Sequence, residues 1–187
     1  MKTLFVYATR YGGTAGTSEE IAKVLREEGF NVKVVNAKEE KIKDISEYEL
    51  IVVGGGMQVG KWTGETEDFL KKFQKELAQK KVAIFVSSVM KSIYEREGKT
   101  DDLEKTRKEY LEDKPAKYGL QPIAVGLFGS VVDYNKMGLI ERKTLGSAKT
   151  RLEAAGFKET KTGVYDTRDW DEIRDWARKL VLKARYL

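Results

Sequence analysis

The chain has 187 residues, of which 41% are hydrophobic and 10% aromatic, the composition of one globular domain with a full core. Charged residues make up 35%, against about a quarter in a typical domain, and the net charge is +5. The sequence contains no Cys and no His, which excludes a thiol nucleophile, an imidazole base, a Cys/His metal site and any disulfide. Any difficult chemistry is therefore expected from a bound cofactor rather than from side chains or a metal.

No apolar run approaches the roughly 20 residues that a helix needs to cross a bilayer. The amino terminus enters an apolar strand pattern without a signal-peptide pattern, so a cytoplasmic protein is expected. The positive balance is compatible with nucleic acid, anionic membranes or anionic substrates. The basic residues are spread along the chain and match no nucleic-acid motif, so no specific nucleic-acid partner is expected.

Predicted strands and helices alternate along the chain. Short apolar runs predict strands at 4–7, 31–36, 50–53, 82–86 and 122–128. Apolar residues at helical spacing predict helices at 18–28, 66–79 and 101–112, and a last helix that carries Trp170 and Trp176 on its apolar face. Thr17 and Glu20 have the spacing of a capping box before the first helix, and Gly29 is placed to end it.

This alternation implies parallel strands joined by right-handed crossovers. Five strands suit the flavodoxin-like order 2-1-3-4-5, so the prediction is a three-layer α/β sandwich that forms a single domain over 1–187. Residues from about 129 to 163 exceed this minimal fold. They are expected to form an insertion after or within the fifth strand, with a helix over about 139–155. Ligands of this fold bind outside the carboxyl ends of the strands, so the loops that follow the strands are the ones to inspect.

The loop after the first strand is rich in glycine and hydroxyl groups. Glycines let backbone N–H groups converge on an anion, hydroxyls add donors, and the start of a helix adds partial positive charge. An ordinary glycine-rich connection is the alternative, and no G-x-G-x-x-G dinucleotide motif is present here. The candidate phosphate-binding residues are Thr9, Arg10, Tyr11, Gly12, Gly13, Thr14, Gly16 and Thr17.

The segment Thr9-Arg10-Tyr11-Gly12-Gly13-Thr14 resembles the phosphate loop of flavodoxins, a Ser/Thr-x-x-Gly-x-Thr pattern. The resemblance implies FMN as the cofactor. A second register stays open, because the segment that starts at Gly16-Thr17 is similar to the Gly-Asn-Thr-Glu-x-x-Ala end of the same motif. The first register keeps the usual distance from the strand. The loop is three or four residues longer than the family's, and a flavin-free binding or regulatory module on this scaffold is the alternative.

Two further loops carry features of a flavin site. In flavodoxins the loop after the third strand often places a Trp on one face of the flavin, and Trp62 is the candidate here; packing of Trp62 under the next helix is the alternative. The loop after the fourth strand contacts the pyrimidine edge of the flavin through its backbone. Tyr94 is a more distant candidate for stacking, with plain surface cover as the alternative. The candidate residues of these loops are Gly56, Met57, Gln58, Val59, Trp62, Ser87, Ser88 and Val89.

The carboxyl-terminal segment Val164-Tyr165-Asp166-Thr167-Arg168-Asp169-Trp170 narrows the resemblance. It is similar to the signature of the menaquinone-dependent protoporphyrinogen oxidase family, a Thr-Asp-Trp before the last helix, with Arg168 inserted here. That family also carries a long insertion after the fifth strand. The resemblance implies an FMN oxidoreductase that oxidises a reduced tetrapyrrole or another hydrogen donor, while both tryptophans are expected to lie in the core.

The partners follow from the same resemblance. It implies a redox partner or small-molecule hydrogen donor, with peripheral membrane or quinone contact and a homodimer as further options. The basic residues of the insertion could meet an anionic partner, or they could form an ordinary solvated face. They are Lys136, Arg142, Lys143, Lys149 and Arg151.

Overall fold

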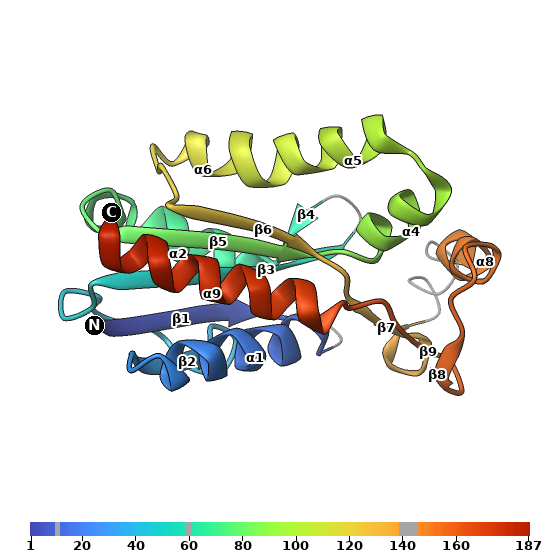
Figure 1. Ribbon diagram of the computed structural model, residues 1–187, viewed down its shortest axis with the longest axis horizontal. Helices are drawn as coiled ribbons and strands as arrows, with labels where there is room; N and C mark the ends of the chain where they lie inside the picture. Colours follow the sequence, from blue (N-terminus) through green and yellow to red (C-terminus); the bar gives the residue numbers. More distant parts are fainter. Residues whose placement is uncertain (10–11, 59–60, 139–145) are drawn as a thin grey trace.

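The computed structural model describes residues 1–9, 12–58, 61–138 and 146–187. Its centre is a parallel sheet in the order β2-β1-β3-β5-β6, to which the short β4 adds an antiparallel partner for β3 (Figure 1). The predicted fold class and strand order are therefore confirmed. The strands are β1 (Lys2–Ala8), β2 (Asn31–Asn36), β3 (Leu50–Gln58), β4 (Lys61–Trp62), β5 (Lys81–Ser87) and β6 (Ala124–Phe128).

Helices cover both faces of this sheet, because successive residues of each buried strand point to opposite sides. On one face, α1 (Gly13–Glu27) and α9 (Trp170–Tyr186) pack on Phe5, Val52 and Phe85. The other face is built on Val6, Val53 and Ile84. Helices α2 (Gly64–Lys72) and α3 (Gln74–Leu77) cover it, together with the π-helical η1 (Lys108–Asp113). The short α6 (Lys114–Lys117) follows η1.

The insertion forms a second, three-stranded sheet in the order β7-β9-β8, with antiparallel pairs. This sheet and α8 lie at the end of the molecule toward which the strands of the main sheet point (Figure 1). The main apolar contacts there join Ile93, Leu152 and Tyr165. The elements are β7 (Val131–Asp133), the 3-10 turn η2 (Tyr134–Lys136), α8 (Gly146–Ala154), β8 (Glu159–Lys161) and β9 (Val164–Asp166). Residues 139–145 of the predicted insertion helix lie outside the described residues.

The first helix begins at Gly13, five residues before the predicted start, so the predicted capping box is wrong. Thr17 lies inside the helix, where its hydroxyl donates to the carbonyl of Gly13 at 3.3 Å. The reason is Gly12, whose left-handed φ of +92° turns the chain directly into the helix. The predicted stop is confirmed: Gly29 has φ +84°, and the Phe30 N–H donates to the Leu25 carbonyl, which closes the helix end.

Other boundaries also differ from the prediction. Residues 66–79 form two helices, α2 and α3, which meet at Phe73. The helix predicted over 101–112 is part of a longer helical run that contains α5 (Thr100–Arg107), η1 and α6, and it is preceded by α4 (Val89–Glu97), which the apolar pattern missed. No helix within the described ranges is long and apolar enough to cross a bilayer.

Candidate functional site

The candidate site lies at the carboxyl ends of β1, β3 and β5, where the chain leaves the sheet for α1 and α4. Ala8 at the end of β1 pairs with Gly55, and Gly56 pairs with Ser87, so the three strand ends lie side by side. The first turn of α1 starts at this edge (Figure 1). The topology therefore brings the three predicted loops together.

The turn before α1 is arranged for an anion. The Gly12 N–H donates to the Thr9 hydroxyl at 2.9 Å, which closes the turn. The helix then starts at once, and the amides of Gly13, Thr14 and Ala15 stand in its first turn, where the helix itself offers them no acceptor. Such a turn attracts negative charge through its N–H groups and the helix dipole. Arg10 and Tyr11 of the predicted loop lie outside the described residues.

Hydroxyl groups line the inner side of this turn. Thr14 is 2% exposed, and a side chain added at Gly56 would come within 3.0 Å of its hydroxyl. Ser87 lies beside Gly56 and is 1% exposed, and its hydroxyl has no hydrogen-bond partner within the described part of the chain. Buried hydroxyls are normally paired. An unpaired one beside a glycine surface and a helix start fits a polar ligand held against the strand ends.

Gly16 and Thr17, the start of the second possible register, lie one turn inside α1. The Thr17 hydroxyl bonds to the helix backbone, and Gly16 lies against the side chain of Arg168. These two residues therefore face other parts of the protein. The helix start itself is formed by Gly12, Gly13 and Thr14, the residues of the first register.

Trp62 was predicted to be exposed and to stack on the flavin, but it is buried. Its side chain is 3% exposed and packs in the core, with ring atoms 3.1 Å from the position of a side chain at Gly55. The cause is the hairpin of β3 and β4, which pairs Met57 with Trp62 and turns the indole inward. Met57 is half-buried against the same core cluster. Gln58 ends β3, and Val59 lies outside the described residues.

Ser88 and Val89 join β5 to α4. The Ser88 N–H donates to the Phe128 carbonyl at 2.9 Å, and Val89 is the first residue of α4 rather than part of a loop. Tyr94 is half-buried one turn later, with the Arg151 guanidinium 5.3 Å from its ring centre. Tyr94 is thus held between α4 and the insertion, as its alternative interpretation of surface cover suggested.

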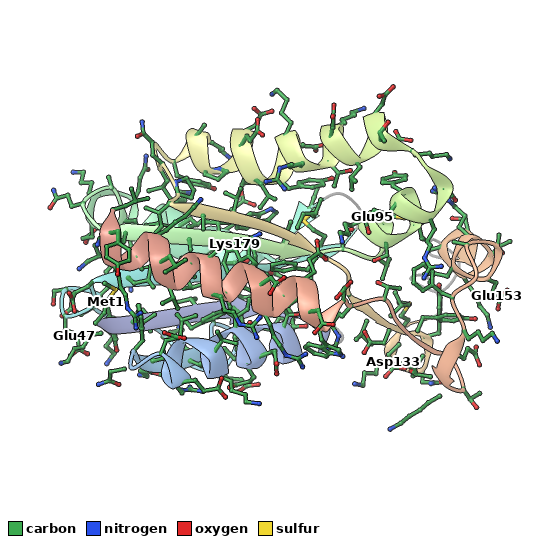
Figure 2. All side chains as sticks on the ribbon, viewed as in Figure 1. Met1, Glu47, Glu95, Asp133, Glu153 and Lys179 are labelled. Atoms are coloured by element: carbon green, nitrogen blue, oxygen red, sulfur yellow. The ribbon has the colours of Figure 1, made fainter. Side chains whose placement is uncertain are left out.

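The basic residues of the insertion are matched by carboxylates. Lys149 lies 3.3 Å from Glu159, and Arg151 lies 2.6 Å from Glu97. Hydrogen bonds from Arg151 lower the pKa of Glu97 to about 2. Lys136 lies 3.4 Å from Asp133, which Figure 2 labels at this end of the molecule. This pairing favours an ordinary solvated face; Arg142 and Lys143 lie outside the described residues.

One neighbour of the helix start was missed by the sequence analysis. Ser130 follows β6, and a side chain at Gly13 would lie 2.5 Å from its hydroxyl and 2.8 Å from the backbone nitrogen of Val131. The Gly129-Ser130 pair after the fifth strand was the available signal, since that strand also ends at the ligand-binding edge. Trp170 and Trp176, which were expected in the core, are partly buried and pack against the core cluster beneath α1 and α9.

Comparisons with known proteins give the family and the fold. The chain is 22% identical to the protoporphyrinogen IX dehydrogenase [quinone] of Escherichia coli K12, over 97% of this chain and 95% of that protein. It is similar in structure to oxidised flavodoxin 1 from Bacillus cereus (TM-score 0.52, 19% identity, 82% of this chain and 98% of that chain). It is also similar to a short-chain flavodoxin associated with a non-canonical PDU bacterial microcompartment (TM-score 0.53, 17% identity, 81% and 99%). The sequence model of the flavodoxin domain family matches residues 4–156, so the chain belongs to this family.

Proposed function

We propose that this protein binds FMN and works as an electron-transfer flavoprotein, most specifically as an oxidoreductase. The observation that carries the proposal is the start of α1 at the strand ends, in a chain of the flavodoxin domain family. In this position an anion meets the helix dipole and the first-turn amides at once. A phosphate monoester has the charge and the acceptor oxygens that this turn can satisfy.

The described residues divide the task between them. Gly13, Thr14 and Ala15 bind the phosphate through their amides, and the Thr14 hydroxyl adds a donor from the inner side. The glycine surface at the end of β3 lets a flat ring approach the backbone, and the Ser87 hydroxyl offers that ring a polar partner. When bound, FMN supplies electron transfer in one or two steps. No acid–base side chain is required, which agrees with the absence of His.

The finer proposal concerns the hydrogen donor. The similarity to protoporphyrinogen IX dehydrogenase [quinone] spans 97% of the chain, including the insertion and α9. This length of similarity favours a reduced tetrapyrrole as donor and a quinone as acceptor over a purely protein-to-protein electron carrier. The sequence identity of 22% makes this the second step of the proposal rather than its basis.

FMN binding is tested by titration, with the visible spectrum and the quenching of flavin fluorescence as readouts. We expect Thr14→Val to weaken FMN binding by about 10- to 100-fold, because a hydrogen bond to a charged group contributes about 1.5–3 kcal/mol. Thr17→Val is the matched control, since that hydroxyl bonds only to the helix backbone in the described structure, and it should bind within about threefold of wild type. A wild-type protein that leaves the FMN spectrum and fluorescence unchanged would refute the proposal.

The donor is tested separately, with FMN-loaded protein under anaerobic conditions. Protoporphyrinogen, the reduced tetrapyrrole, should bleach the flavin absorbance. Porphyrin fluorescence should then grow on addition of a quinone, which reoxidises the flavin. If the flavin stays oxidised with this donor but is reduced by dithionite, the tetrapyrrole proposal fails while FMN binding stands.

A further inference from the structure

Arg168 stands at the first turn of α1, although it belongs to the opposite end of the chain. Its guanidinium forms a bidentate pair with the Asp166 carboxylate, with Nε 2.9 Å from Oδ1 and Nη2 2.5 Å from Oδ2. It lies 4.3 Å from the ring centre of Trp170, and its Nη1 donates to the Gly13 carbonyl at 3.5 Å. The side chain is only 13% exposed. Contacts with three partners, Asp166, Trp170 and Gly13, therefore hold the guanidinium in place.

Two glycines at the start of α1 make room for this arrangement. A side chain at Gly16 would collide with Nη1 of Arg168, and one at Gly13 would collide with Ser130. Neither glycine has a positive φ, so the backbone conformation does not require glycine there. Gly13 and Gly16 are thus explained by close approach of other segments rather than by close approach of a ligand.

The same point joins the insertion to the domain. The two segments that lead into and out of the insertion cross here: the Ser130 N–H donates to the Thr167 hydroxyl at 3.0 Å, and the Thr167 N–H donates to the Ser130 carbonyl at 2.9 Å. The Ser92 hydroxyl of α4 donates to the Thr167 carbonyl at 3.1 Å. Arg168 follows Thr167 directly, and its contact with the Gly13 carbonyl connects this junction to α1.

The charge of Arg168 is balanced by Asp166. A cation at the start of a helix is the reverse of the usual preference, because the helix dipole already makes that end positive. The Arg168 side chain and backbone outweigh the effect of burial and hold the pKa of Asp166 below its ordinary value. That carboxylate offsets the single charge of Arg168, and the positive helix end remains available to a second anion.

We propose that Arg168 is a positioning residue for the FMN phosphate. It holds the first turn of α1 in its binding geometry and, through Asp166 and the Ser130–Thr167 junction, makes phosphate affinity depend on the docking of the insertion. This inference rests on the proposed function. It assigns a role at the phosphate site to a residue that lies more than 150 positions away in the sequence, at the end of the insertion.

The test compares the affinities of FMN and riboflavin, because only FMN carries the phosphate. Arg168→Met should weaken FMN about tenfold and leave riboflavin within about twofold. Gly16→Ala should do the same, because its methyl group displaces the end of the Arg168 side chain. The double variant should bind FMN no less tightly than the single variant with the lower FMN affinity, because both changes disrupt the same contact. Arg178→Met, an exposed residue of α9, the helix that follows Arg168, is the control and should bind both flavins as wild type does.

One further variant makes the test decisive. Arg168→Lys retains the charge but not the bidentate pair with Asp166. A positioning role therefore predicts a loss of FMN affinity close to that of Arg168→Met. If Arg168→Met does not unfold cooperatively, Gly16→Ala carries the same test with the guanidinium present. An FMN-to-riboflavin ratio that stays at the wild-type value in these variants overturns the inference alone. Wild-type protein that binds neither flavin overturns the proposed function, and this inference with it.

Discussion

Gly54 lies within the parallel sheet, where the ring of Phe85 on the neighbouring strand occupies the space that a side chain would need. That ring is fully buried and contacts the rings of Phe5 and Phe128, at centroid distances of 5.9 and 5.7 Å. It therefore cannot move without displacing other aromatic residues. The glycine is a requirement of core packing at this position.

We expect Gly54→Ala to lower the free energy of unfolding by about 1–3 kcal/mol, the usual cost of overpacking a core. Urea unfolding followed by circular dichroism measures it. Gly64→Ala is the control, because nothing lies within 4 Å of the added methyl group at the start of α2, and it should be neutral or slightly stabilising. Equal midpoints for the two variants would contradict this account of the Phe85 contact.

Asp166 gives a prediction for pH. Burial raises the pKa of Asp166. Hydrogen bonds from Arg168 and the charge of its guanidinium lower this pKa by a larger amount, so the pKa in the folded state lies below the ordinary 3.8. A carboxylate with a depressed pKa stabilises the fold at pH values above 3.8, and this contribution is lost as pH falls through the folded pKa. Asp166→Asn should therefore reduce stability by about 1–2 kcal/mol at pH 7. The difference from wild type should shrink below pH 3.8. A constant difference across a pH series of thermal melts would show that the charge is not responsible.

At the scale of the element, α9 depends on its first residues. The Asp169 carboxylate accepts hydrogen bonds from the amides of Asp171 and Glu172, each at 3.0 Å, which caps the helix. We expect Asp169→Ala to cost about 1 kcal/mol in unfolding free energy. Asp175→Ala, within the same helix and bonded only to Arg178 at the surface in the described structure, should cost less than about 0.5 kcal/mol. Thermal melts of the two variants compare these effects, and equal losses would argue against the cap.

The limits of prediction at this scale have physical causes. The buried strands were predictable because they are unbroken apolar runs, whereas α4 was not, because its buried face includes Lys91 and Ser92. These polar residues are buried by partners distant in sequence: Lys91 lies 2.7 Å from Glu172, and Ser92 bonds to Thr167. A local apolar pattern cannot contain that information.

The same reasoning separates the parts of the candidate site. Gly13 and Thr14 could be named as candidate phosphate-binding residues, because a glycine-rich loop after a strand has a local signal, although the helix was expected to start only at residue 18. The inward turn of Trp62 depends on a two-residue strand, and the contact of Arg168 with Gly16 depends on the crossing of two distant segments. Arg168 was visible in the sequence only as one extra residue before the last helix.

At the scale of the whole molecule, the described residues form one large core cluster on each face of the main sheet and a small cluster under the insertion. The main sheet is covered on both faces, while the insertion rests on the cluster of Ile93, Leu152 and Tyr165. Its outermost strand, β8, has three exposed residues and an irregular register with β9. Local stability follows the amount of buried apolar surface. The insertion should therefore open more readily than the sheet on which it is mounted.

Hydrogen exchange followed by mass spectrometry tests this division and its link to the site. Amides of β1, β3 and β5 should exchange slowest, and those of β8 fastest among the strands. Added FMN should slow exchange in the first turn of α1 and, through Arg168 and Thr167, at the crossing of the insertion segments. Exchange in α3, which lies on the other face, should not change. Uniform exchange across both sheets would mean that the insertion unfolds with the domain, and an FMN effect confined to α1 would mean that the two are not coupled.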